Sequence, residues 1–342
     1  MTFRTHTSMM RKAAAVCVAA ALLGSMGACS EPLPTVQSET TATPAVTVQL
    51  PVTEDQEKQI RARILDVVNS ATENKDASQL SSRVSGPELD IRTSEIAVYA
   101  FTGNADDAIE LPSEASQINL PITTSWPRSI FTITTTTSDQ QSQRLLVMTQ
   151  DSAHSDYKLW GVCPLFQNVQ MPAFSVDGNL LGGADDTGFV LAPKDALTQY
   201  ADVLQNGDSS ASSSLFEDDQ LRQNISSVSS KIQQTFDDTG VQFSQTEEFT
   251  ADDSQIQVMH TADGGELVVG RIDSVWTRSL DQNRQALPAS DAEKALFGAT
   301  EATNSIKVTY VNTVALYVPA ADSGQQIRAV GAQRQPVKAE AV

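Results

Sequence analysis

The chain has 342 residues, of which 42 are acidic and 23 are basic, so its formal net charge at pH 7 is −19. Such an acidic chain is not expected to bind nucleic acid, because phosphate groups require basic partners. The length is sufficient for two domains, and no long apolar stretch occurs beyond the N-terminal region.

The N-terminal residues 1–28 are predicted to form a lipoprotein signal peptide. Two basic residues precede an apolar run at 13–23, which is too short to span a membrane and leads into small residues. Residues 26–29, Met-Gly-Ala-Cys, resemble a bacterial lipobox, in which the cysteine is linked to diacylglycerol and becomes the mature N-terminus. The alternative is an ordinary secreted protein with an incidental Cys29, because Met26 stands where leucine is usual.

Lipidation of Cys29 would fix the location of the protein. Cleavage removes three basic residues and no acidic residue, so the formal charge changes from −19 to −22. Anionic lipid repels such a chain, and acyl chains on Cys29, palmitate among them, are expected to hold it on the extracytoplasmic face of the cell membrane. Cys17 leaves with the signal peptide, so Cys163 has no partner for an internal disulfide and is expected to be buried.

Residues 29–52 are predicted to be a tether, because they are rich in Pro, Thr, Ser and Ala and have no periodic apolar face. Folding is expected to begin at Thr53, which fits a capping box with Gln56. An amphipathic helix follows, since its apolar residues recur at helical spacing, and a short second helix is expected at 77–83.

From Ile91 onward the residue types favour strands, with Ile96, Val98 and Phe101 in the first of them. Four further strands are predicted at residues 118–126, 129–137, 144–150 and 157–163. Helices followed by antiparallel strands predict a first α+β domain over residues 53–165.

The same pattern is predicted again after a connector at residues 166–191. Two helices are expected, one from Pro193 and one at 216–236, each with an apolar face. The strands are predicted at 241–250, 255–261, 266–276 and 306–318, with a hairpin turn at 263–265. This second α+β domain covers residues 192–320, and residues 321–342 are expected to form a flexible tail because they contain few apolar residues.

The predicted fold class is therefore α+β, with two tandem domains of helices on a curved antiparallel sheet. The motif Trp-x-Arg-Ser occurs at 126–129 and again at 276–279, which is consistent with a duplication.

Several short patterns occur in a definite order along the chain. They are Trp126-Pro127-Arg128, Leu145-Leu146-Val147, Tyr157-Lys158-Leu159-Trp160, Pro164-Leu165 with Met171-Pro172-Ala173, Ala192-Pro193, Tyr200-Ala201-Asp202 and Gly264-Gly265. Over roughly residues 53–318 they resemble an uncharacterised family of actinobacterial envelope lipoproteins. The resemblance implies tandem domains similar to nuclear-transport-factor-2-like or cystatin-like folds. It implies no activity and carries no catalytic residues.

No catalytic or metal-binding set is predicted. After cleavage the histidines are His154, in a polar hairpin, and His260, at a strand end, and neither has the neighbours of a Ser-His-acid triad or the spacing of a zinc site. Asp90 and Asp273 are the candidates for a catalytic carboxylate in an apolar cavity. The simpler interpretation is that each is a solvated carboxylate at a strand edge. No cofactor is expected.

A binding surface is the more conservative functional hypothesis. The candidates are Trp126, Arg128, Trp160, Trp276 and Arg278, whose aromatic faces and guanidinium groups could line concave sheets. Core packing is the competing reading for them. The predicted function is a membrane-anchored, non-catalytic binding or assembly module at the cell envelope, with an envelope protein or an apolar ligand as partner. The alternative is a cone-fold enzyme or a carrier of small ligands or lipids.

Overall fold

The computed structural model describes residues 50–342 except 124, 138–141 and 299–300. Cys29, the predicted signal peptide and the predicted tether up to residue 49 lie outside the described residues. Among the helices that are described, none combines the length and the apolar character needed to cross a membrane.

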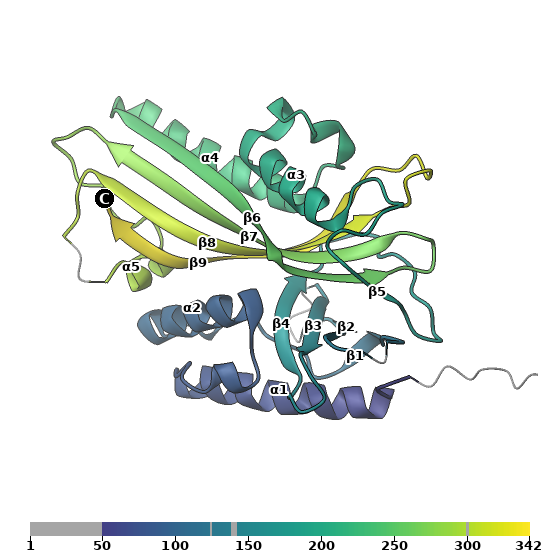
Figure 1. Ribbon diagram of the computed structural model, residues 1–342. Coiled ribbons are helices and arrows are strands. Elements are labelled where there is room, and N and C mark those ends of the chain that lie inside the picture. Colours follow the sequence, from purple (N-terminus) through teal and green to yellow (C-terminus); the bar gives the residue numbers. More distant parts are fainter. Residues whose placement is uncertain (1–49, 124, 138–141, 299–300) are drawn as a thin grey trace, which may run out of the picture. The chain divides into compact units, whose positions relative to one another are not determined.

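Residues 50–342 are arranged in layers around two antiparallel sheets (Figure 1). The smaller sheet has the order β1-β2-β3-β4 and consists of β1 (Ala115–Asn119), β2 (Arg128–Thr134), β3 (Arg144–Gln150) and β4 (Lys158–Pro164). The larger sheet has the order β5-β6-β7-β8-β9 and consists of β5 (Leu181–Gly182), β6 (Phe243–His260), β7 (Glu266–Leu280), β8 (Ser305–Val318) and β9 (Arg328–Ala341). The predicted α+β class is confirmed.

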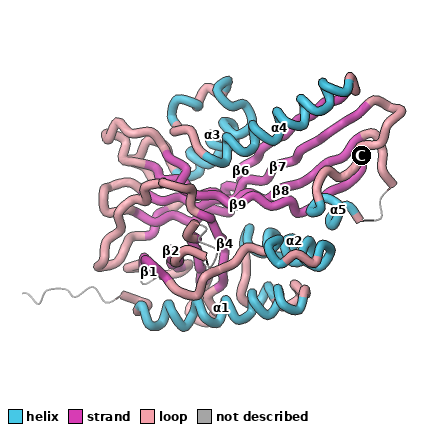
Figure 2. Tube along the Cα trace, turned by 180° about the vertical axis from the view of Figure 1, so that it is seen from behind, coloured by secondary structure: helices cyan, strands magenta, loops and turns pink. Residues whose placement is uncertain are grey.

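Helices pack against both sheets. The α-helices are α1 (Glu54–Asn74), α2 (Gly86–Thr102), α3 (Pro193–Asn206), α4 (Gln220–Thr239) and α5 (Asp291–Phe297). Short 3-10 turns lie at η1 (Leu80–Ser82), η2 (Ala105–Asp107), η3 (Gly207–Ser209) and η4 (Ser213–Leu215). The view from behind agrees that α3 and α4 lie on one side of the larger sheet, and that α1, α2 and the smaller sheet lie on the other (Figure 2).

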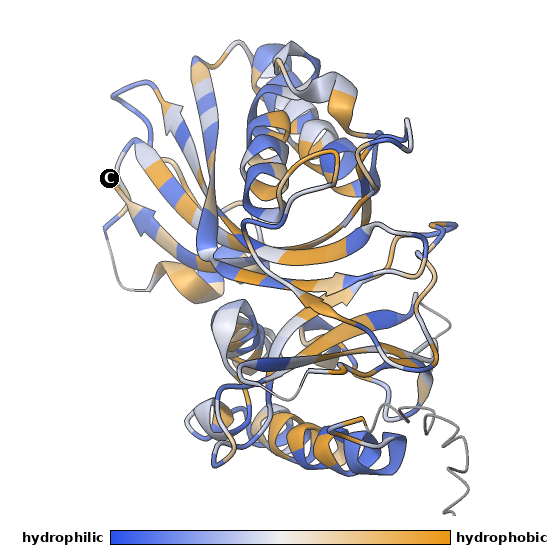
Figure 3. Ribbon diagram, turned by 45° about the vertical axis from the view of Figure 1, so that its right-hand side comes forward, coloured by the Kyte–Doolittle hydropathy of each residue, from blue (hydrophilic) through white to orange (hydrophobic). Residues whose placement is uncertain are grey.

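The two sheets pack face to face, so their strands are apolar on both sides. In β2, Ile130 belongs to a core shared with α1, whereas Phe131 belongs to a core shared with the larger sheet. The larger sheet alternates in the same way: Leu267 faces the smaller sheet, and Val268 packs beneath α3. Figure 3 shows hydrophobic segments along the strands of both sheets. Residues 53–165 and 192–320 therefore share one core, in which Cys163 is fully buried, as expected.

The first helix forms where the sequence predicted it. The side chain of Thr53 accepts a hydrogen bond from the backbone of Gln56, and the side chain of Gln56 accepts one from the backbone of Thr53, which confirms the capping box. One turn further, Glu57 pairs with Arg61 at 2.9 Å and accepts a hydrogen bond from Thr132 of β2. All three side chains are buried, so this polar contact fixes the position of α1 on the smaller sheet.

The strand predicted from Ile91 onward is wrong, because these residues form α2. Gly86 and Pro87 open the helix, and proline at this position is compatible with helical geometry. Arg92 then pairs with Glu88 one turn before it and with Glu95 one turn after it, at 3.3 and 2.9 Å. These charged contacts at helical spacing outweigh the strand preference of the β-branched residues between them.

The flexible tail predicted at residues 321–342 is also wrong, because most of it is β9. This strand pairs with β8 from Tyr317↔Arg328 to Ile306↔Ala341. Its side chains are mostly small, which hid the strand in the sequence, yet Val330 is fully buried between the sheets. Gln333 donates a hydrogen bond to Glu95 of α2, so β9 also fastens that helix.

We predict that Val330→Ala lowers the free energy of unfolding by about 1–3 kcal/mol, because the lost side chain is fully buried. Lys338→Ala in the same strand is the control, since Lys338 is 59% exposed and should change stability by less than about 0.5 kcal/mol. Denaturant unfolding measures both values. Equal small effects would contradict a structural role for β9.

Candidate functional site

A chain of cavities runs beneath α4. One of about 950 Å³ lies between the end of α3, the first half of α4 and the start of β6, with Trp276 among its lining residues. Two smaller cavities, of about 240 and 150 Å³, follow along the same helix toward its C-terminal end. We call these three cavities the α4 groove.

The groove exists because α4 is held mainly at its two ends, with a single hydrogen bond, from Gln245 to Ser229, in the middle. At its start, the N-cap Asp219 accepts hydrogen bonds from the backbone N–H groups of Leu221 and Arg222 and from the hydroxyl of Tyr200. At its end, the ring of Phe236 stacks on Phe243 of β6, with the ring centroids 4.2 Å apart.

Between these attachments the apolar face of α4 is incompletely covered. Ile225, Val228 and Ile232 continue the helical stripe, but Leu221 is the only buried residue of the helix, and Val228 is 49% exposed. The middle of α4 is therefore separated from the sheet by accessible space.

The floor of the groove carries a polar network on the larger sheet. Arg334 of β9 pairs with Glu247 of β6 at 2.7 Å and donates hydrogen bonds to Ser274 and Asn312. Its guanidinium lies 3.8 Å from the ring centre of Tyr310. Burial raises the pKa of Tyr310 to about 12, so its hydroxyl remains protonated at physiological pH.

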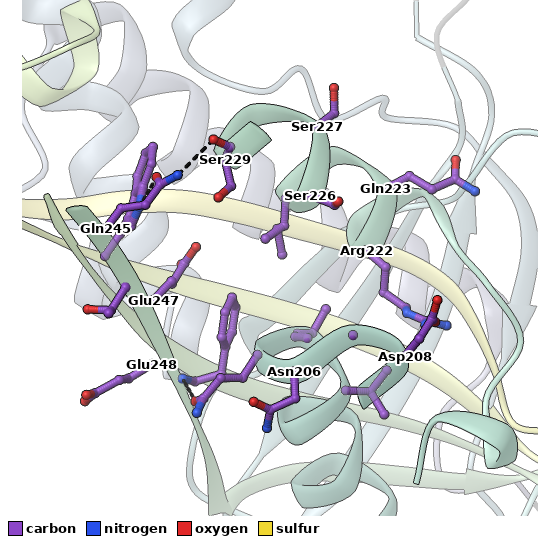
Figure 4. Close-up of a pocket in the computed structure, with 18 of the residues that line it drawn as sticks. Asn206, Asp208, Arg222, Gln223, Ser226, Ser227, Ser229, Gln245, Glu247 and Glu248 are labelled. Atoms are coloured by element: carbon purple, nitrogen blue, oxygen red, sulfur yellow. Dashed lines mark hydrogen bonds and ion pairs between the residues drawn. The ribbon is translucent and has the colours of Figure 1, made fainter. Parts of the chain in front are cut away.

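Gln245 connects the floor of the groove to its roof. It accepts a hydrogen bond from the indole of Trp276 at 3.2 Å and donates one to the backbone oxygen of Ser229 in α4 at 2.9 Å. Figure 4 shows Gln245 and Glu247 on the strand, with Ser226 and Ser229 on the facing helix. Amide, hydroxyl, carboxylate and aromatic groups thus converge on one space.

The groove also reaches the edge of the larger sheet. β5 pairs with β6 only at Met259 and Val258, so the first half of β6 has no strand on its outer side in the described part of the chain. The backbone N–H of Phe249 points outward and donates to the side chain of Gln205. Because alternate amides of a strand share a direction, those of Gln245 and Glu247 also point outward.

The structure separates the five residues predicted to bind a ligand. Trp276 lines the polar part of the groove, and Arg278 lines its apolar end. Trp126 and Arg128 line a different cavity of about 390 Å³ beside α1. Trp160 is buried between the two sheets.

The two Trp-x-Arg-Ser motifs nevertheless have similar local geometry. The guanidinium of Arg128 lies 4.0 Å from the ring centre of Trp126, and that of Arg278 lies 4.5 Å from the ring centre of Trp276. Arg278 also pairs with the buried Glu293 of α5. Each motif therefore places a cation on an indole face at the margin of a cavity.

The carboxylates nominated as catalytic groups lie outside the groove. Asp90 of α2 and Asp273 of β7 both pair with Arg271, at 2.6 and 2.9 Å. Burial raises the pKa of Asp273, and Arg271 partly opposes the rise. Both side chains are partly exposed, which suits an ion pair between α2 and the sheet better than a base in an apolar cavity. His154 is exposed in a turn.

Glu247, Gln245 and Arg334 are the groove residues that the sequence did not indicate. The start of β6 gave no signal for the first two, since residues 244–248 between Phe243 and Phe249 are all polar and show no alternation with apolar residues. Arg334 had no signal either, because it lay in the segment expected to be a flexible tail.

Residues 49–341 match the model of a family described as a domain of unknown function (DUF8094). The chain belongs to this family. The match covers every helix and strand described above, so the whole α4 groove lies within the family's domain. Neither a curated protein nor a solved structure is similar enough to the chain to count as a match.

We predict a coupling energy of about 1–3 kcal/mol between Arg334 and Glu247 in a double-mutant cycle with alanine, because both side chains are largely buried and lie within one network. The exposed pair Lys294–Asp291 is the control and should couple by less than about 0.5 kcal/mol. Urea unfolding of the single and double variants measures the energies. Additive effects at Arg334 and Glu247 would contradict the network.

Proposed function

We propose that the protein is a lipid-anchored lipoprotein on the extracytoplasmic face of the cell membrane, and that its folded part is a non-catalytic binding module. The partner is an extended segment of another envelope protein, held in the α4 groove. The observation that carries this proposal is the open outer edge of β6 beside a groove lined by backbone, amide and aromatic groups.

Strand addition suits this arrangement. An extended segment could accept hydrogen bonds from the outward N–H groups of Gln245 and Glu247, and its alternate side chains could enter the groove. Consecutive residues of β6, from Gln245 to Phe249, line the large cavity, as expected for a cavity that lies against a strand edge. Serine and glutamine side chains of α4 form the facing wall.

The charge of the groove favours a basic segment. Asp208, Asp218, Glu247 and Glu248 line the large cavity, and they outnumber the cations beside them, Arg222 and the Arg334 that pairs with Glu247. Electrostatic complementarity would then raise the association rate of a partner with lysine or arginine in the bound segment.

The apolar end of the groove supports the second candidate, carriage of an apolar ligand. Phe236, Phe243, Leu280 and Leu287 line this end. Its volume of about 150 Å³ is small for a lipid chain, so the segment of an envelope protein is the preferred occupant.

Attachment to the membrane rests on the predicted lipidation of Cys29. With a formal charge of −22 after cleavage, the chain has no electrostatic attraction to anionic lipid, and diacylglycerol on Cys29 would supply the attachment.

We predict that metabolic labelling with a fatty-acid probe marks the wild-type protein and not Cys29→Ala, because Cys29 is the expected acceptor. Cys17→Ala is the matched control and should label like the wild type, since Cys17 lies within the apolar run of the signal peptide. Equal labelling of Cys29→Ala and the wild type would rule out the lipobox.

Gln245→Pro should abolish capture of the partner, because proline removes the outward N–H of this residue and leaves the pairing of β6 with β7 intact. Gln245→Ala is the control: it loses the same side-chain hydrogen bonds but keeps the N–H, so it should retain capture. The measurement is crosslinking in cells from a photo-reactive amino acid placed at Ser226 in α4.

The same amino acid placed at Asp66, which is exposed on α1, reports the background. Capture of the same protein by Gln245→Pro and Gln245→Ala would contradict strand addition. Capture of a lipid in place of a protein would favour the carrier.

A further inference from the structure

Three ligand-type side chains converge at the hairpin end of the larger sheet, away from the residues that line the α4 groove. Asp186, His260 and Glu266 each place one oxygen or nitrogen within 4.8 Å of the other two. The His260 Nε2 atom is 3.2 Å from Asp186 Oδ2. Two ligands of one metal ion lie at comparable separations, since each is about 2 Å from the ion.

The topology explains why these residues meet. His260 ends β6 and Glu266 begins β7, and the two are paired across the hairpin. β5 pairs with β6 at Gly182, and the loop that follows brings Asp186 back over the hairpin. The backbone N–H of Gly183 donates to Asp186 Oδ2 at 3.0 Å and holds the carboxylate in place.

Glu266 lacks the partners that a buried carboxylate needs. The residue has no exposed surface, and neither of its carboxylate oxygens has a hydrogen-bond partner among the described residues. Burial raises the pKa of Glu266 to about 8, and the charge of Asp186 adds to the rise. An unpaired buried carboxylate costs several kcal/mol, and a bound cation would offset this cost.

Space between the ligands is kept by a glycine. A Cβ atom on Gly182 would lie 2.7 Å from Asp186 Oδ2 and 3.1 Å from His260 Nε2, closer than side-chain atoms normally approach. A residue with a side chain at this position would occupy the space between the two ligands.

We propose that Asp186, His260 and Glu266 bind one divalent transition-metal ion of the Zn²⁺ or Mn²⁺ class. An imidazole with two carboxylates is a donor set for such ions, whereas Ca²⁺ and Mg²⁺ prefer oxygen ligands alone. The side chains of Asp186 and His260 are 34% and 31% exposed, so water can complete the coordination. No metal site was expected from the sequence, because the histidines and the cysteine lack close ligand spacing, and Asp186 and His260 are 74 positions apart in the chain.

The bound ion would fasten the loop that precedes α3. This loop already touches the helix, since the backbone N–H of Lys194 donates to the backbone oxygen of Ala184. A metal ion at Asp186 would add a second connection, from the loop to β6 and β7, and would stabilise the folded state by mass action.

The test is metal binding by the full-length protein, purified in detergent and stripped with a chelator. Calorimetric titration with ZnCl₂ and MnCl₂ should give one site per chain for at least one of the ions, and saturation with that ion should raise Tm by roughly 5 °C. CaCl₂ and MgCl₂ should give at least about tenfold weaker binding at this site.

His260→Ala and Glu266→Gln should each weaken binding at least about tenfold and abolish the Tm shift, because each removes one ligand. Glu266→Gln keeps the shape of the side chain, so the metal-free variant remains folded and the lost binding can be read directly. The controls His154→Ala and Asp185→Asn change another histidine and a neighbouring exposed acid, and should bind like the wild type.

Binding elsewhere on the chain would survive both His260→Ala and Glu266→Gln, because these substitutions change only the proposed ligands. Unchanged binding by His260→Ala and Glu266→Gln would therefore overturn the proposal. The absence of one-to-one binding for both Zn²⁺ and Mn²⁺ would overturn it as well.

Discussion

The rest of the structure depends on the packing of the smaller sheet against one face of the larger sheet. This contact buries Phe131 and Val147 on one side and Val269 and Ala315 on the other. Because the inner faces are filled in this way, α1 packs on the outer face of the smaller sheet and α3 on the outer face of the larger sheet, whereas α2 and α5 lie beside the smaller sheet against β8 and β9. α1 and α3 therefore lie on the two outer faces of a pair of packed sheets.

The α4 groove follows from unequal strand lengths. β6 and β7 have 18 and 15 residues, whereas no strand of the smaller sheet has more than 7. The hairpin half of the larger sheet is packed on both faces, by the smaller sheet and by α3. The other half extends beyond α3, and α4 alone covers it on that side. A single helix held mainly at its ends does not fill so long a strip, which leaves space above Trp276 and Tyr310.

Local signals in the sequence were reliable where the structure is determined locally. The Thr53 capping box, the strand at 144–150 and the turn at 263–265 all depend on neighbouring residues, and all three are confirmed. β9 was missed because contacts between distant residues stabilise it: Gln333 and Glu95 are 238 positions apart. α2 was missed because its charged contacts at helical spacing stand among β-branched residues that favour strands. Only part of the α4 groove could be predicted from the sequence. Trp276 stood out as an aromatic residue, but its neighbour Arg334 acquires a role only when β9 has formed.

α3 connects two regions of the larger sheet, the cluster of Asp186, His260 and Glu266 and the open edge of β6. Its first turn contacts the loop of Asp186, and Gln205 in its last turn occupies the outward N–H of Phe249 at the edge of β6. The helix has 14 residues and spans about 21 Å as a rigid rod. Its apolar face is fully buried, with Leu197 packed directly against Gly270 of β7, so it cannot slide without opening the core. Any displacement of α3 would therefore change both the geometry of the Asp186 cluster and the accessibility of the β6 edge. The close packing at Gly270 holds α3, and with it both regions, in place.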